Sequence, residues 1–342
     1  MERLARIEAV LFEALRLREP GPHGPTLTSE RGAQIVAPAR RLMERGGKRW
    51  RALFMQLACE MHGGGDRALP LIPLVELTHA GSLIIDDIED GARTRRGGPA
   101  AHVEFGVDVA VNAGNLVYFL PTRMLDRPPA DVPALDAAEE LRVYRMYAAT
   151  MRKLHYGQGL DILWHRPGAI LPSAADYMSM CTLKSGSLAG LALGLGAALG
   201  GAEAAAVSSL VAIGERFGVS FQIIDDVTNL ERGNPGKDRG DDLIEGKKSL
   251  PLILHRERSG AGELWAILDG IQNRPIEQVR PQIDRAVALL QASGSLQDAR
   301  RRAGDLYRET RVDLAALVPE GEPADRLLEM ADALIGAGGP TV

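Results

Sequence analysis

The order of apolar and polar residues along the chain predicts helices and little else. Over residues 2–18 and 71–90, apolar side chains recur every three to four positions, the spacing that places them on one face of a helix. Alternation of β-branched residues is scarce, and no short hairpin turn stands out. We therefore expect an all-α fold. Further helices are expected at residues 34–61 with an interruption at 46–51, and at 107–126, 134–164, 174–200, 203–232 and within 250–336.

The chain shows no sign of a domain boundary. No Pro- or Ser-rich linker divides its 342 residues, and no repeat of 20–50 residues is visible. We expect residues 1–342 to form a single large helical bundle with the active site in its central cavity. Residues 1–30 would form an N-terminal helix and loop, and residues 337–342 a disordered tail.

An unusual acidic cluster, Asp86-Asp87-Ile88-Glu89-Asp90, ends one of these apolar helices. Asp86 and Asp90 are four residues apart, so they share a helix face and repel each other unless a cation lies between them. Oxygen ligands with room for water suit Mg²⁺. A solvated acidic helix end is the competing interpretation, and it would be the better one for an isolated cluster.

A second cluster repeats the arrangement further along the chain. Asp225-Asp226-Val227-Thr228-Asn229 again follows an apolar run and again precedes a basic loop. The two clusters together favour a metal site that binds a polyanion. Lysines and arginines beside glycines or at helix ends would supply the remaining positive charge for a load as large as two diphosphates. They are Lys48, Arg51, Arg95, Arg96, Lys184, Lys237 and Lys247.

Composition and charge exclude several other classes of protein. The formal net charge of −5 leaves no basic footprint for nucleic acid. Cys59 and Cys181 form neither a disulfide framework nor a zinc pattern, and the N-terminus has no apolar leader, so a cytoplasmic location is expected. The apolar run at 187–202 is shorter than the roughly 20 residues that a bilayer helix needs, so we expect no transmembrane segment.

These motifs resemble those of the trans-isoprenyl diphosphate synthases, in family order from about residue 40 to residue 255. The resemblance rests on Gly46-Gly47-Lys48-Arg49-x-Arg51, Glu76 to Asp90 with Arg95-Arg96-Gly97-x-Pro99, Gly157-Gln158-Gly159-Leu160-Asp161, Lys184-Ser185-Gly186, Phe221 to Asn229, and Gly236-Lys237 to Lys247. Asn229, Val117-Tyr118-Phe119 and the segment around His155 are most similar to geranylgeranyl diphosphate synthases of the animal and fungal type.

The resemblance implies the isoprenoid synthase fold and a metal site of about three Mg²⁺ ions, for which Mn²⁺ would substitute. Asp86, Asp90 and Asp225 would be the ligands, with Asp87 and Asp226 secondary. The implied catalytic group is Asp86, Asp87, Asp90, Arg95, Lys184, Asp225 and Lys237.

The same resemblance divides the substrate contacts between two diphosphates. The allylic diphosphate would be held by Arg95, Lys184 with Ser185, Gln222 and Lys237, with Lys247 closing the site. Isopentenyl diphosphate would be held by Gly47, Lys48, Arg51, His79 and Arg96. His79 alone would be a core histidine by default, but it lies seven residues before Asp86, on the same helix face.

Product length would be set by the floor of an apolar tunnel. Gly81 and Ser82 are small and would let the chain pass, while Tyr118, Phe119 and His155 would stop it at C20. Plain helix packing is the competing interpretation for the aromatic pair. The expected function is therefore Mg²⁺-dependent condensation of isopentenyl diphosphate with dimethylallyl, geranyl or farnesyl diphosphate to give geranylgeranyl diphosphate, by a homodimer.

Three alternatives stay open at this point. A synthase of longer chains (C25 or more) would share every motif. A terpene cyclase should not need Lys48, Arg51, His79 and Arg96, so their presence counts against it. A non-catalytic subunit would usually lack one aspartate cluster, whereas the first is complete here.

Overall fold

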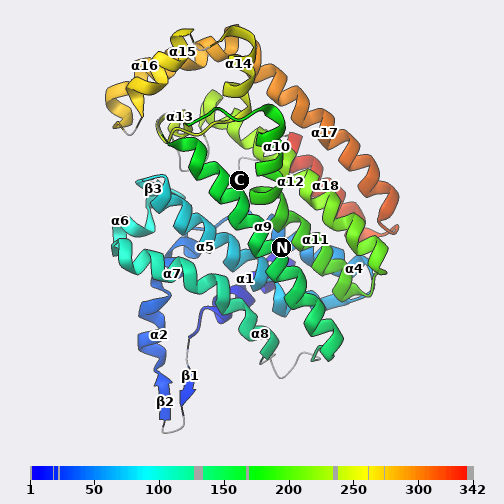
Figure 1. Cartoon of the computed structure of the whole chain (residues 1–342). Helices are drawn as coiled ribbons and strands as arrows, with labels where there is room; N and C mark the ends of the chain where they lie inside the picture. Colours follow the sequence, from blue (N-terminus) through cyan, green and yellow to red (C-terminus); the bar gives the residue numbers. More distant parts are fainter. Residues whose placement is uncertain are drawn as a thin grey trace. The chain divides into compact units, whose positions relative to one another are not determined.

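A computed structural model describes residues 2–17, 19–21, 24–126, 134–166, 169–233, 238–260, 262–272 and 274–336 (Figure 1). The all-α prediction is confirmed, since helices make up most of the described residues. The contacts group into two compact units, which we describe one at a time. Unit 1 comprises Met1–Ala149, Leu191–Leu210 and Pro319–Leu327, and unit 2 comprises Thr150–Gly190, Val211–Val318 and Leu328–Val342. The single domain over residues 1–342 stays a prediction.

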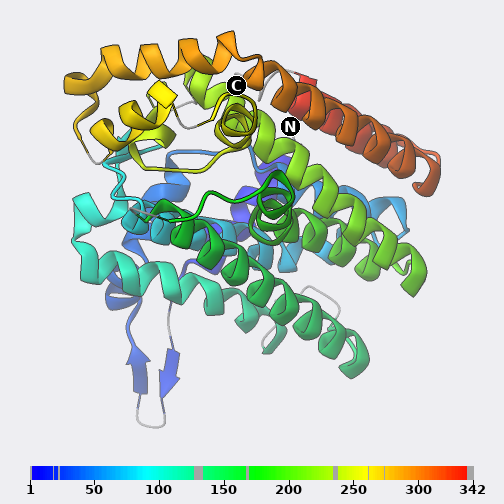
Figure 2. The same ribbon diagram turned by 45° about the horizontal axis from the view of Figure 1, so that its top comes forward.

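Unit 1 holds the N-terminal elements. They are α1 (Glu2–Ala14), β1 (Glu19–Gly21), β2 (Gly24–Leu27), α2 (Ser29–Ile35), α3 (Ala37–Glu44), α4 (Trp50–Met61), the 3₁₀ helix η1 (Gly65–Leu71), α5 (Pro73–Glu89), β3 (Thr94–Arg95), β4 (Gly98–Pro99), α6 (Ala101–Phe105), α7 (Val107–Phe119), the 3₁₀ helix η2 (Leu120–Thr122) and α8 (Arg123–Asp126). The antiparallel β1–β2 hairpin projects from the helices of this unit (Figure 2).

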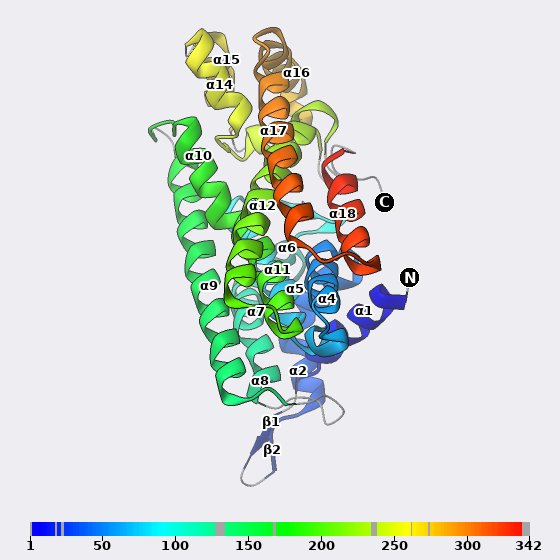
Figure 3. The same ribbon diagram turned by 90° about the vertical axis from the view of Figure 1, so that its right-hand side faces the viewer.

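Unit 2 holds α10 (Ala174–Cys181), the π-helix η3 (Thr182–Gly186), α13 (Asp241–Ile244), α14 (Leu250–Ser259), α15 (Gly262–Ile271), α16 (Ile276–Ala292) and α17 (Ser295–Leu317). Helices α14 and α16 both pack on α17, and α15 packs on α16, so these four helices form one packed group within the unit (Figure 3). Four helices contribute residues to both units: α9 (Ala137–His165), α11 (Ser187–Gly200), α12 (Ala204–Arg232) and α18 (Glu322–Gly336).

The core of unit 1 is built around α5, which packs mainly on α7. Its apolar face is fully buried, including Leu74, Leu77 and Ile84. Gly81 lets the two helices approach closely, because a Cβ atom there would lie 2.7 Å from the carbonyl oxygen of Gly114. Helix α5 is thus buried along its apolar face and reaches the surface at its acidic C-terminal end.

The helical stretch expected over residues 34–61, with its interruption at 46–51, is α3 and α4, and its first two residues belong to α2. Thr28 caps α2 by accepting a hydrogen bond from the Arg31 backbone N–H, and Val36 separates α2 from α3, which starts with a proline in its first turn. The two short hairpins, β1–β2 and β3–β4, were not predicted, because strands of two to four residues carry too little alternation to be recognised.

Three helical stretches are long and apolar enough to cross a membrane by length and composition alone: Gly65–Glu89, Ala174–Gly200 and Ala204–Arg232. In their most apolar windows, 72%, 78% and 56% of the residues are buried inside the protein. Helix packing therefore accounts for much of this apolar surface, and the absence of a transmembrane segment stays a prediction.

Candidate active site

The first aspartate cluster occupies the C-terminal end of α5. Asp86 and Asp87 lie in its last turn, and Asp90 is the residue that caps it, with its backbone N–H donating to the Asp86 carbonyl. Carboxylates at this end oppose the helix dipole and need nearby cations. Asp86 and Asp90 remain partly exposed, whereas Asp87 is only 1% exposed.

Arg95 compensates the buried carboxylate. Its Nε donates to Asp87 Oδ1 at 2.8 Å, its Nη2 contacts the same oxygen, and Nη2 lies 3.7 Å from Asp86. Asp87 is therefore committed to a protein cation, while Asp86 and Asp90 keep the spacing and exposure that suit a hard divalent metal. Among the described residues, no three His, Cys, Asp or Glu side chains group closely enough to hold a metal by themselves.

Arg96 lies at the tip of the β3–β4 hairpin beside Gly47. Arg96 and Gly97 both have positive φ, 50° and 71°, the combination typical of a tight two-residue hairpin turn. A Cβ on Gly47 would lie 3.0 Å from Arg96 Nη2, so the two predicted contacts of isopentenyl diphosphate adjoin each other. Lys48 is exposed, and the Arg51 guanidinium stacks 4.2 Å from the centre of the Trp50 ring.

His79 lies in this same electropositive region. Burial lowers the pKa of His79 well below its ordinary value, and the charges of Arg51, Arg96, Arg95 and Arg49 lower it further. Burial, followed by the charges of Arg49, Arg95 and Arg51, lowers the pKa of Arg96 to about 10. A neutral imidazole surrounded by several guanidinium groups is typical of a site that binds an anion.

Arg49 belongs to the motif at residues 46–51 without a predicted substrate contact, and the structure gives it a structural role. It is 3% exposed, and its Nη2 donates to the Met43 carbonyl at 2.9 Å. Its guanidinium also lies 3.3 Å from Glu8 and 3.8 Å from Glu76. Arg49 thus connects the start of α4 to α1, α3 and α5.

In unit 2, Lys184 is held by the predicted Gly157-to-Asp161 motif. Its Nζ donates to Asp161 Oδ2 at 2.6 Å, and His165 Nε2 lies 2.8 Å from the other carboxylate oxygen. A Cβ on Gly157 would lie 2.4 Å from the Lys184 backbone nitrogen, so this glycine lets α9 meet the π-helix. Burial alone would raise the pKa of Asp161, but Lys184 and His165 outweigh it and hold that pKa far below its usual range.

The second aspartate cluster is organised around a buried carboxylate with neutral partners. Asp226 accepts hydrogen bonds from Tyr177 Oη at 2.6 Å and from Gln222 Nε2 at 2.8 Å. Ser185 Oγ donates to Gln222 Oε1 at 2.6 Å and extends the network. Burial, followed by the charge of Asp242, raises the pKa of Asp226 to about 7. Tyr177 and Asp242 were not predicted, since neither stands in a recognisable pattern.

The remaining predicted residues of unit 2 vary in their surroundings. Asp225 is partly exposed. Asn229 is 0% exposed, and among the described residues its amide has no hydrogen-bond partner. Lys247 lies 2.7 Å from Glu245 and 3.4 Å from Asp242. Lys237 lies outside the described residues.

The predicted tunnel floor is only partly assembled within unit 1. Gly81 faces Tyr118, which is 5% exposed, and a Cβ on Gly81 would lie 3.0 Å from the Tyr118 ring. Ser82 donates back to the His79 carbonyl of its own helix at 2.8 Å. Phe119 is 71% exposed. His155, in unit 2, is exposed, and its Nδ1 lies 2.8 Å from the Met151 carbonyl.

Comparisons with known proteins extend this description. The model of the family described as polyprenyl synthetase matches residues 33–284. A geranylgeranyl pyrophosphate synthase of Apiospora sacchari is 32% identical over 323 residues, which cover 93% of this chain and 91% of the relative. A geranylfarnesyl diphosphate synthase of Aeropyrum pernix is 33% identical over 286 residues, covering 81% and 86%.

Solved structures agree with the sequence relatives. A geranylgeranyl pyrophosphate synthase structure superimposes with a TM-score of 0.83 at 21% identity, covering 98% of both chains. A polyprenyl synthase of Caulobacter crescentus, complexed with calcium and isoprenyl diphosphate, superimposes with a TM-score of 0.80 at 26% identity, covering 98% of this chain and 94% of that one.

Proposed function

The chain belongs to the polyprenyl synthetase family, and on that premise we propose that it condenses isopentenyl diphosphate with an allylic diphosphate to make geranylgeranyl diphosphate. Membership makes it a prenyl diphosphate synthase, and the C20 product is the proposal. Geranylgeranyl pyrophosphate synthases dominate the relatives at about this similarity.

The observation that carries the proposal is the difference between the buried and the partly exposed carboxylates at the end of α5. Arg95 pairs closely with the buried Asp87, whereas Asp86 and Asp90 are partly exposed and lie four residues apart, an arrangement that suits a metal. The family uses divalent metals, and we propose Mg²⁺, bound by Asp86, Asp90 and Asp225. A bound metal would neutralise the diphosphate that leaves the allylic substrate.

The protein's own side chains would perform the remaining tasks. Lys184 would stabilise the negative charge that develops as the allylic C–O bond breaks, and Asp161 fixes the position of its ammonium group. Arg96 and neutral His79 would hold isopentenyl diphosphate with its double bond directed at the allylic carbon. The apolar surroundings of Gly81 and Tyr118 would shield the cation from water.

Product analysis tests the proposal directly. Purified protein with Mg²⁺ and isopentenyl diphosphate is supplied in turn with dimethylallyl, geranyl and farnesyl diphosphate, and the products are separated by chromatography. A C20 product from each primer is expected. Absence of any condensation product would contradict the proposal.

A longer-chain synthase is the second candidate, favoured by one observation. Phe119 is 71% exposed, so within unit 1 only Tyr118 forms a buried aromatic stop. The geranylfarnesyl diphosphate synthase among the relatives is consistent with this alternative. A C25 main product from wild-type protein would select it. Tyr118→Ala should lengthen the product whichever candidate holds, and Val312→Ala, at an exposed apolar residue of α17, is the control.

We also propose that the active form is a homodimer that pairs through α7. Val107, Val111 and Phe119 leave an apolar stripe on this helix, with 55%, 36% and 71% of their surfaces exposed. Exposed apolar area of this kind commonly marks an interface. Light scattering on Val111→Glu should show a monomer if α7 is the interface, and an unchanged dimer would contradict it.

A further inference from the structure

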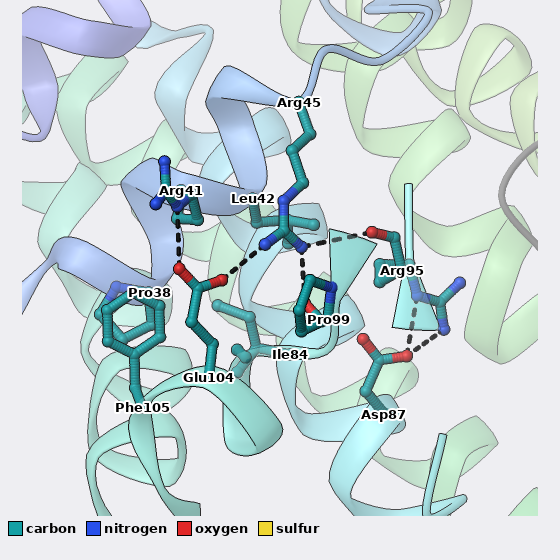
Figure 4. Close-up of a pocket in the computed structure, with 11 residues that line it drawn as sticks. Pro38, Arg41, Leu42, Arg45, Ile84, Asp87, Arg95, Pro99, Glu104 and Phe105 are labelled. Atoms are coloured by element: carbon teal, nitrogen blue, oxygen red, sulfur yellow. Dashed lines mark hydrogen bonds and ion pairs between the residues drawn. The ribbon is translucent and has the colours of Figure 1, made fainter. Parts of the chain in front are cut away.

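A small cavity of about 10 Å³ lies behind the predicted diphosphate arginines, between the end of α3, α6 and the β3–β4 hairpin (Figure 4). That volume is near the minimum for one water molecule, so the cavity is no substrate site. The side chains around it are nevertheless heavily charged. They make contacts that no sequence motif predicted.

Arg45, the residue directly before Gly46-Gly47, reaches across to the hairpin. Its Nη1 donates to the carbonyl oxygens of Pro99 at 2.6 Å and Arg95 at 3.3 Å. Its Nη2 donates to Glu104 at 2.6 Å, which offsets its charge. Gly98 leaves room for the guanidinium, since a Cβ there would lie 2.6 Å from Arg45 Cζ.

An arginine of the hairpin makes the same kind of contact in the opposite direction. Nη1 of Arg96, at its tip, donates to the carbonyl oxygens of Leu42 at 3.2 Å and Gly46, which flank Arg45 at the end of α3. Each of the two arginines thus donates its guanidinium N–H groups to main-chain carbonyls of the segment that carries the other arginine. We call this arrangement the reciprocal clasp: Arg45 on Arg95 and Pro99, and Arg96 on Leu42 and Gly46. Its bonds join two segments that both carry predicted contacts of isopentenyl diphosphate.

We infer that Arg45 is a positioning residue for isopentenyl diphosphate, an inference that rests on the proposed function. The Arg95 side chain is fixed independently, by its two bonds to Asp87. The position of Arg96, by contrast, depends on how the hairpin tip and the Gly46-Gly47 turn are held together. Loss of Arg45 therefore loosens the isopentenyl side of the site more than the allylic side.

Steady-state kinetics of Arg45→Gln test this selectivity. The KM for isopentenyl diphosphate should rise about tenfold or more, since small misplacements of binding groups are costly, while the KM for the allylic substrate stays within about twofold. Arg45→Lys should recover only part of the loss, because an ammonium cannot span two carbonyls and Glu104 together. Arg41→Gln is the matched control. Arg41 also pairs with Glu104, at 2.9 Å, but no bond from Arg41 to the hairpin is seen among the described residues.

Gly98→Ala provides a second route to the same state if Arg45→Gln folds poorly. The added methyl displaces the guanidinium without removing a charge, and it should raise the same KM. Equal KM changes for both substrates, or none, in these variants would overturn the inference. Calorimetric binding of isopentenyl diphosphate separates the two proposals. Weaker binding to Arg45→Gln supports the clasp even if wild-type protein forms no product, which would contradict only the proposed function.

Discussion

The two aspartate clusters look alike in sequence but bury their second carboxylate in opposite ways. In the first, Asp87 is 1% exposed and is neutralised by the fork of Arg95. In the second, Asp226 is 7% exposed and is held by the neutral donors Tyr177 and Gln222. The first lies beside a cation, whereas burial and Asp242 raise the pKa of the second to about 7.

The clusters also end differently. Asp90 caps α5, so the chain turns away and leaves this carboxylate partly exposed. Helix α12 continues to Arg232, so Asn229 lies inside the helix and is 0% exposed. A carboxylate at that buried position would carry a larger desolvation cost than the neutral amide does. The comparison teaches that a shared acidic pattern does not imply a shared environment for the buried carboxylate.

The largest effect is expected for the exposed carboxylate of the first cluster. Asp86→Ala should reduce kcat/KM by orders of magnitude, because it removes a proposed metal ligand and no core side chain. Asp225→Ala should do the same for the second cluster. Glu89→Ala, on the exposed side of α5, is the control. Circular dichroism should show unchanged helix content, and near-normal turnover of Asp86→Ala would refute the assignment.

The next largest effect separates the two buried carboxylates. Asp87→Asn should lower the free energy of unfolding by about 3 kcal/mol, because it removes the carboxylate that Arg95 binds most closely in a mostly buried site. Asp226→Asn should cost less than about 1 kcal/mol near pH 7, since an amide resembles the partly protonated acid it replaces. Denaturant unfolding of the metal-free protein measures both. Equal losses would remove the distinction between the clusters.

A smaller effect concerns pH. The lowered pKa of His79 means that the folded protein resists a proton which the unfolded chain accepts. Stability should therefore fall as the pH drops below about 6.5, by at most about 1.4 kcal/mol per pH unit for this group. Unfolding midpoints between pH 5 and 8 measure the slope. His79→Gln should flatten it, and an unchanged slope would place its origin elsewhere.

The smallest effect tests the neutral network of the second cluster. Tyr177→Phe removes one of the two donors to Asp226 and should cost about 1 kcal/mol of stability or less. Tyr307→Phe is a matched control, because its hydroxyl donates to Asp332, which Arg311 also contacts at 3.0 Å. Thermal unfolding of both variants should show the larger loss for Tyr177→Phe. The reverse order would mean that Asp226 does not depend on this hydroxyl.

The sequence predicted the helical parts of this protein well, because they depend on local spacing. Periodicity placed the end of α5 at its acidic cluster, where α5 does end. It missed the β3–β4 hairpin, whose strands are too short to show a period and which binds Arg45, a residue distant in the chain. It joined α3 to residues before Val36, since the proline at the start of α3 was not weighed as a helix start.

The same distinction between local patterns and contacts distant in the chain holds for the candidate site. Asp86, Asp90, Arg95 and Arg96 could be proposed from their motifs alone. Arg45, Tyr177 and Asp242 could not, because each acts through a partner that only folding brings near. Asp161 is intermediate: it stood in a quoted motif, but its role as the partner of Lys184 required the contact between α9 and the π-helix.

The left-handed backbone at two arginines has a consequence for engineering this protein. Among the described residues, Arg49 and Arg96 are the non-glycine residues with positive φ, 48° and 50°. Glycine would relax the main chain at either position, but at Arg49 it would also remove the buried contacts that join α4 to α1, α3 and α5. At Arg96 such a choice would delete a proposed substrate contact, so selection for stability and selection for turnover should diverge at this one codon.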